Sequence, residues 1–167
     1  GTYITALEPQ QLISHLDFVL SKDPVALAQV IETRRVVEVG NVRLAAARIT
    51  PEQVAHLEGL LAELRGTVAD ADRFSTLDIE FHDAVCEAAG NFLLAQVMRI
   101  INTLGKVSRE PTGAWRATRE RALGDHEAIL AALRAADADG AASAMTTHLD
   151  HVEAALAGAT RAGRPTP

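Results

Sequence analysis

Four residues in this sequence combine metal-binding chemistry with helical spacing. Asp78 and His82 are four positions apart, so on a helix both side chains lie on one face and can hold one ion between them. Both fall on the apolar stripe of their segment, which consists of Phe74, Leu77, Phe81, Val85 and Ala88. His126 and His148 fall on the apolar stripes of two later segments. One carboxylate and three imidazoles are therefore expected to point into the interior.

Such a group is expected to bind a divalent metal ion. A buried carboxylate is costly unless it is paired or bound to a metal. Mixtures of aspartate and histidine suit zinc, nickel, manganese or iron, and zinc is the ion most expected to be found there. The Asp-x-x-x-His pair alone is a weak signal, and a single inward histidine is more often a hydrogen-bonded core residue. The convergence of all four favours a metal site with Asp78, His82, His126 and His148 as ligands.

Arg34 has two interpretations. It lies along the apolar stripe of its own segment, which includes Leu27, Ile31, Val37 and Leu44. It can form a structural salt bridge with Glu38, one helical turn further on. It can equally bind the carboxylate of a ligand, because a guanidinium group donates two parallel hydrogen bonds to a carboxylate. The residues alone leave both interpretations open.

The remaining candidates are interpreted as structural. His15, His56 and His151 fall off or beside the stripes, as surface residues or as groups behind the metal ligands. Trp115 is expected to pack near a helix start, and Cys86 to be a small buried hydrophobic residue. Because Cys86 is the only cysteine, no intrachain disulfide can form, which fits a reducing cytoplasm.

The segments that position these residues are predicted to be helical. Apolar residues recur at spacings of three and four, between good helix formers. Thr50-Pro51-Glu52-Gln53 has the pattern of a capping box, Asp23-Pro24 repeats the cap-and-proline signal, and Gly90-Asn91 marks a stop and a new start. The predicted helices, joined by short connections, are 9–21, 24–48, 51–67, 70–89, 91–109, 114–136 and 138–159. The sequence therefore predicts an all-α antiparallel bundle.

Composition limits the functions open to this chain. Its 167 residues are 48% apolar and carry a net charge of −6, which indicates one domain with a sizeable core. The acidic balance argues against nucleic-acid binding by these residues. No apolar run is long enough to span a membrane, and Gly1–Thr5 does not begin a signal peptide, so a cytoplasmic location is expected. Because the chain begins without methionine, it is expected to be a piece of a longer protein.

Several motifs together resemble one family of regulators. They are Glu32–Glu38 with Arg43–Ala47, Asp78–His82 with Ala88–Asn91, Asp125–Leu130, and Ala144–Leu149. In these segments, and over nearly the whole chain, the sequence is similar to the C-terminal effector-binding (FCD) domain of the FadR subfamily of GntR-type bacterial transcription regulators. The motifs are specific as a set, although each alone is not.

The resemblance implies a fold and a site. The fold would be an antiparallel bundle of six or seven helices with a central pocket for a metal and a small organic acid. The family's metal ligands correspond to Asp78, His82, His126 and His148, and its inward arginine to Arg34 as the ligand clamp. One small departure is Asp125, because glutamate is commoner before this histidine in the family.

The resemblance also implies a domain organisation. Family members form homodimers and bind DNA through an N-terminal winged helix-turn-helix domain. Gly1–Ile4 is similar to the end of that domain's wing, so residues 1–8 are expected to be the linker remnant of an absent DNA-binding domain. Residues 9–160 would then be the effector-binding domain and residues 161–167 a disordered tail.

Two alternatives remain at this stage. The first is a small all-α metalloenzyme, which needs an open metal position and a general base. Glu80, Asp83 and Glu87 turn away from the metal-facing stripe, and no Glu-x-x-His pair typical of di-iron bundles occurs, so no enzyme is predicted. The second is a dimerisation module in which the metal only holds helices together. Sequence leaves open the effector, the metal, and the choice between repressor and activator.

Overall fold

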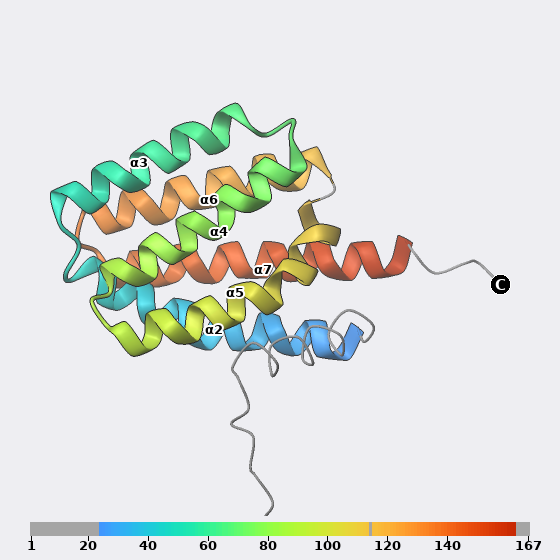
Figure 1. Cartoon of the computed structure of the whole chain (residues 1–167), viewed down its shortest axis with the longest axis horizontal. Helices are drawn as coiled ribbons and strands as arrows, with labels where there is room; N and C mark the ends of the chain where they lie inside the picture. Colours follow the sequence, from blue (N-terminus) through green and yellow to red (C-terminus); the bar gives the residue numbers. More distant parts are fainter. Residues whose placement is uncertain (1–23, 114, 163–167) are drawn as a thin grey trace, which may run out of the picture.

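The protein is an all-helical bundle over the residues that its computed structural model describes, 24–113 and 115–162, with the backbone alone for 24–26, 103–113 and 160–162. In these ranges there are no strands, and Figure 1 shows the helices lying side by side. The helices are α2 (Pro24–Ala46), α3 (Pro51–Gly66), α4 (Ala71–Ala88), α5 (Phe92–Gly113), α6 (Arg116–Arg134) and α7 (Ala138–Ala162). The prediction of an all-α fold is confirmed. The predicted helix 9–21, the linker 1–8 and His15 lie outside the described residues.

Salt bridges between exposed side chains show how the helices run. Between α3 and α6, Arg65 pairs with Glu127 and Arg134 pairs with Glu58, so these helices are antiparallel. Arg35 in the middle of α2 pairs with Asp150 and Glu153 of α7, and Arg43 near the end of α2 pairs with Asp139 at the start of α7, so these two helices are also antiparallel. Exposed pairs of this kind add about 1 kcal/mol or less each, so they indicate helix direction rather than account for stability.

Helices α2 and α4 are an exception, because they run in the same direction (Figure 1). From α2 to α4, Glu38 contacts His82 and Asn41 contacts Cys86; just past the ends of the two helices, Arg48 donates to the carbonyl of Ala89. Both partners advance along the chain together. The antiparallel α3 between them returns the chain to the same end of the bundle, so two helices rich in polar inward residues come into direct register.

Helix ends largely follow the predicted signals. Thr50 and Gln53 form the reciprocal capping box at the start of α3, and Gly90 has a φ of 65°, the left-handed conformation expected after a helix. Two boundaries were predicted too short. Helix α5 continues through Pro111 to Gly113, beyond its predicted end at residue 109. Helix α7 continues to Ala162, beyond its predicted end at residue 159, and the rest of the predicted tail, 163–167, lies outside the described residues.

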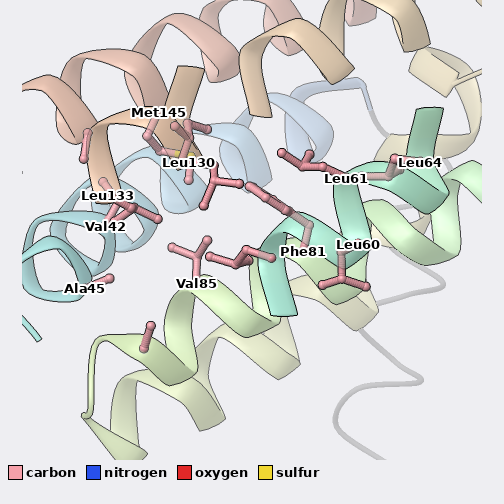
Figure 2. Packing of buried hydrophobic residues seen from close by; sticks show 14 of the residues in the cluster. Val42, Ala45, Leu60, Leu61, Leu64, Phe81, Val85, Leu130, Leu133 and Met145 are labelled. Carbon is pink, nitrogen blue, oxygen red and sulfur yellow. The ribbon is translucent and has the colours of Figure 1, made fainter. Parts of the chain in front are cut away.

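An apolar core fills the space between α3, α4, α6 and parts of α2 and α7. Figure 2 shows this packing, with Phe81 pointing into it from α4. The whole predicted stripe of α4 is buried: Phe74, Leu77, Phe81, Val85 and Ala88. Burial of apolar surface at about 25 cal/mol per Å² is what holds the helices in place around the polar centre described next. Among the described residues, no helix is long and apolar enough to cross a membrane.

Candidate metal centre

The four predicted ligands meet in the centre of the bundle. Helix α4 supplies Asp78 and His82, α6 supplies His126, and α7 supplies His148; one possible ligand atom from each lies within 4.8 Å of all the others. The three imidazole rings have centroid separations of 4.7–5.2 Å. All four residues are buried, and Asp78 is the most exposed of them at 9%. The arrangement brings together residues that are up to 70 positions apart in the chain.

The ring orientations indicate which nitrogen of each histidine faces the centre. Nε2 of His126 lies 3.4 Å from Oδ1 of Asp78, and Nε2 of His82 lies 3.9 Å from the same oxygen. On the other side of its ring, Nδ1 of His82 lies 2.5 Å from Oε2 of Glu38. Nδ1 of His148 lies 3.5 Å from Oδ2 of Asp125. In His82 and His148, Nδ1 therefore faces an outer carboxylate, which leaves Nε2 for an ion.

The nitrogen atoms that face the centre fit a metal ion. Within the described part of the chain, Nε2 of His82, His126 and His148 is buried and makes no hydrogen bond. Burial, followed by the charge of neighbouring histidines, lowers the pKa of His126 well below the usual range, and burial also lowers the pKa of His148. Neutral imidazoles with a free nitrogen are what metal coordination requires, since a protonated ring cannot bind a cation.

Arg34 and Glu38 lie next to the cluster on α2. Nε of Arg34 is 2.6 Å from Oε1 of Glu38, and both side chains are 1% exposed. The predicted salt bridge is therefore present. Nη2 of Arg34 is buried and has no hydrogen-bond partner among the described residues, so the guanidinium retains a donor. The carboxylate clamp remains a prediction that this free donor supports.

The charges of this pair are strongly coupled. Burial alone would raise the pKa of the Glu38 carboxyl, but the charge of Arg34 and the contact with His82 outweigh it, and the pKa lies far below its usual range. Burial alone would lower the pKa of Arg34, and Glu38 reverses that effect. Both groups are therefore ionised in the interior, which is tolerable only because each is paired.

A second carboxylate, Asp125, lies behind His148. Its Oδ2 atom is 2.9 Å from Nδ1 of His151, whose side chain is 36% exposed. Burial would raise the pKa of Asp125, but its hydrogen bonds to His148 and His151 lower it overall. The prediction of His151 as a group at the surface or behind the ligands agrees with this position.

Sequence reasoning missed the role of Glu38 toward His82, and it missed Asn41. Both lie on the inward face of α2 with Arg34, at spacings of four and seven residues, and that helical spacing was the available signal. Nδ2 of Asn41 donates to the sulfur of Cys86 at 3.2 Å. Burial raises the pKa of the Cys86 thiol strongly, so Cys86 stays protonated and behaves as the small buried residue that was expected.

The other candidates lie away from the centre. His56, Glu80 and Glu87 are exposed, and Oδ1 of Asp83 accepts a hydrogen bond from Asn102 rather than facing the histidines. Trp115 is 46% exposed, and its ring lies beside Gly158 of α7.

The hydrophobic surroundings of the cluster are also defined. The ring of Phe81 stacks on His126 with a centroid separation of 4.4 Å, so an apolar wall covers one side of the centre. A surface groove of about 320 Å³ lies between α3 and α6, and it is lined by Leu61 and Leu130 among others, not by the four central residues. A central ligand pocket remains a prediction.

A helical bundle with this buried Asp–His cluster is the class of effector-binding domain that the sequence motifs suggested. Residues 29–151 match the FCD domain family, which covers most of the chain. The chain therefore belongs to the FCD domain family.

Named relatives agree with this assignment. The chain is 29% identical to the HTH-type transcriptional regulator LutR of Bacillus subtilis (strain 168), over 95% of this chain and 74% of LutR. It is 32% identical to the galactonate operon transcriptional repressor of Escherichia coli (strain K12), over 75% of this chain and 55% of that protein. The solved structure of Streptococcus agalactiae GntR has a TM-score of 0.67 and 26% identity, covering 80% of this chain and 61% of that one.

These relatives define the kind of protein. They are named as transcriptional regulators, so the chain is a regulatory domain and not an enzyme, as predicted. The chain spans between about half and three quarters of the length of these relatives.

Proposed function

We propose that this domain senses a small organic acid through a buried divalent metal ion. The observation that carries the proposal is the convergence of Asp78, His82, His126 and His148, with their ligand atoms within 4.8 Å of one another. Three imidazoles and one carboxylate suit zinc, nickel, manganese or iron, and zinc is the first ion to test. The bound ion would supply a positive charge at the centre that attracts a carboxylate.

Arg34 is the proposed partner of the organic acid. In octahedral geometry, four protein ligands leave two metal positions open, which a carboxylate or hydroxy acid can fill. The unpartnered Nη2 of Arg34 would then bind the acid's other polar end. The name of the galactonate operon repressor supports this chemical class, since galactonate is itself a hydroxy acid.

The whole protein is proposed to be a cytoplasmic homodimer that binds DNA through an N-terminal domain. A ligand can change DNA affinity only by binding one arrangement of the dimer better than the other. Helix α5 offers a candidate contact for the second copy, because Leu93, Val97 and Ile100 follow one face and are 42–72% exposed. A Val97→Glu variant that remains dimeric by light scattering would exclude that face as the contact.

The metal site is tested by substitution and metal analysis. We expect the protein to bind one equivalent of Zn²⁺ after it is stripped and reloaded, and His126→Ala and His148→Ala to lose most of this binding. His56→Ala is the matched control, because His56 is exposed and lies away from the cluster. Full stoichiometric metal in both cluster variants would contradict the proposal.

The organic acid is tested by thermal shift. Organic acids, galactonate among them, are added to the protein with and without Zn²⁺, because a specific ligand raises the apparent stability by mass action. We expect a shift that needs both the metal and Arg34, and that Arg34→Lys reduces. If Zn²⁺ binds but no acid shifts the melting temperature, the metal serves only to hold helices together.

A further inference from the structure

Glu38 is shared between the arginine and the metal centre. Its Oε1 atom lies 2.6 Å from Nε of Arg34, and its Oε2 atom lies 2.5 Å from Nδ1 of His82. All three side chains are 1% exposed or less. One carboxylate thus connects the proposed anchor for an organic acid with a proposed metal ligand, without intervening solvent.

The contact with His82 selects a tautomer. An ionised carboxylate can only accept hydrogen bonds, so Nδ1 of His82 must carry the proton that lies between them. The other nitrogen, Nε2, faces Asp78 and the other two histidines, and in this tautomer it carries the lone pair that an ion would need. A carboxylate in this position also fixes the ring plane and makes the ligating nitrogen more basic.

The contact with Arg34 keeps the carboxylate in place. Helix α2 places Arg34 and Glu38 one turn apart on its inward face, and α4 runs parallel to it, so His82 lies directly opposite Glu38. Without Arg34, an ionised Glu38 would be a negative charge buried without its arginine partner, which is costly.

We propose that Glu38 is a positioning residue for the metal centre, held in place by Arg34, and that it fixes His82 with Nε2 available to the ion. The inference rests on the proposed metal site, since it concerns how one ligand is prepared for the ion. It gives Arg34 a second role, through Glu38, that does not depend on any organic acid.

The Glu38→Gln variant tests the tautomer directly. A glutamine offers one accepting oxygen and one donating NH₂ group, so it cannot accept from both Arg34 and His82. With its oxygen on Arg34, the NH₂ group faces Nδ1 of His82, which must then become the acceptor and move the proton to Nε2. We expect ¹⁵N NMR of the metal-free protein to show Nδ1–H in the wild type and Nε2–H in Glu38→Gln. An Nε2–H tautomer of His82 in the wild type would overturn the inference.

Metal affinity gives a second and independent readout. We expect Glu38→Gln to weaken Zn²⁺ binding about 10- to 100-fold in competition with a chromogenic chelator, as is usual for outer carboxylates of metal-bound histidines. Glu32→Gln is the matched control, because it removes the same charge from an exposed position of α2. Unchanged Zn²⁺ affinity in Glu38→Gln would also overturn the inference.

The Arg34→Gln/Glu38→Gln double variant guards against misfolding, because it leaves neither charge unpaired in the interior. We expect its Zn²⁺ affinity to match that of Glu38→Gln alone, since Arg34 acts on the ion through Glu38. A Zn²⁺ affinity of the double variant well below that of Glu38→Gln would contradict the proposal that Arg34 acts through Glu38. If the wild type binds no Zn²⁺, the proposed function fails, and the NMR result still decides the role of Glu38.

Discussion

The two outer carboxylates of the centre differ in their surroundings. Glu38 is 1% exposed, contacts His82 at 2.5 Å, and is paired with an equally buried arginine. Asp125 is 12% exposed, contacts His148 at 3.5 Å, and has the half-exposed His151 as its other partner. A carboxylate that contacts the outer nitrogen of a histidine therefore occurs twice, once fully buried and once near the surface.

The difference in burial implies different roles for the two carboxylates. A buried, charge-paired carboxylate holds its histidine in one geometry and is expensive to disturb, because any loss leaves an uncompensated charge in the interior. A carboxylate near water can exchange a protein partner for solvent at little cost. We therefore expect the geometry of the centre to depend more on Glu38 of α2 than on Asp125 of α6, whose position should tolerate change better.

The largest effect is expected from removing Glu38. Glu38→Ala leaves Arg34 buried without its partner, and the loss of one member of such a pair costs about 3–5 kcal/mol. Asp125→Ala removes a partly exposed carboxylate, and we expect a loss of about 1 kcal/mol. Urea unfolding of the metal-free proteins measures both. Equal losses would mean that the two sides of the centre do not differ as described.

Acid is expected to destabilise the metal-free protein in two stages. The pKa values of His126 and His148 are lowered in the folded state, so below about pH 6.5 the unfolded chain takes up protons that the folded chain does not. Stability is full above that pH and falls as the pH drops. The depressed carboxyl pKa values of Glu38 and Asp125 add a second loss, beginning below their ordinary values of about 4.5 and 3.8.

Thermal unfolding between pH 7.5 and pH 4 measures this loss of stability. Bound Zn²⁺ should shift the first stage to lower pH, because the ion competes with protons for the same nitrogens. Stability that stays constant from pH 7.5 to pH 5.5 without metal would contradict the assignment of neutral buried histidines.

A smaller effect is expected from Asp125→Asn. The amide keeps the size of the side chain but loses the charge that supports His148, so Zn²⁺ binding should weaken about 10-fold, the lower end of the range for outer carboxylates. Chelator competition measures the Zn²⁺ affinity of this variant and of Glu38→Gln, and so compares the contributions of the two carboxylates. A greater loss in Asp125→Asn would reverse the comparison.

The smallest effect is expected from His151→Gln. Glutamine can still donate to Asp125, and the position is at the surface, so Zn²⁺ affinity at pH 7.5 should change less than about twofold. The same chelator assay measures it. A loss as large as that of Asp125→Asn would show that His151 takes part in holding the ion.

Sequence reasoning predicted the helical fold and the meeting of four polar residues in its centre for a definite physical reason. Helical periodicity identifies which residues face inward, and Asp78, His82, His126 and His148 stand out because polar residues are rare on such faces. Thr50 and Gly90 mark a helix start and a helix end, because a capping side chain and a left-handed glycine are local backbone requirements.

The contacts between helices could not be predicted in the same way. Glu38 was expected to pair only with Arg34, because both lie on one helix and their spacing can be counted. Its contact with His82 depends on α2 and α4 being parallel and in register, which no local pattern encodes. The position of Asp125 between His148 and His151 likewise depends on how α6 and α7 cross.

The burial of the centre has a consequence for the rate at which an ion is exchanged. The four residues are at most 9% exposed, and they come from three different helices. An ion held there can leave only when α4, α6 and α7 separate. The rate of metal loss should therefore reach a ceiling as the chelator concentration rises, and that ceiling reports how often the bundle opens.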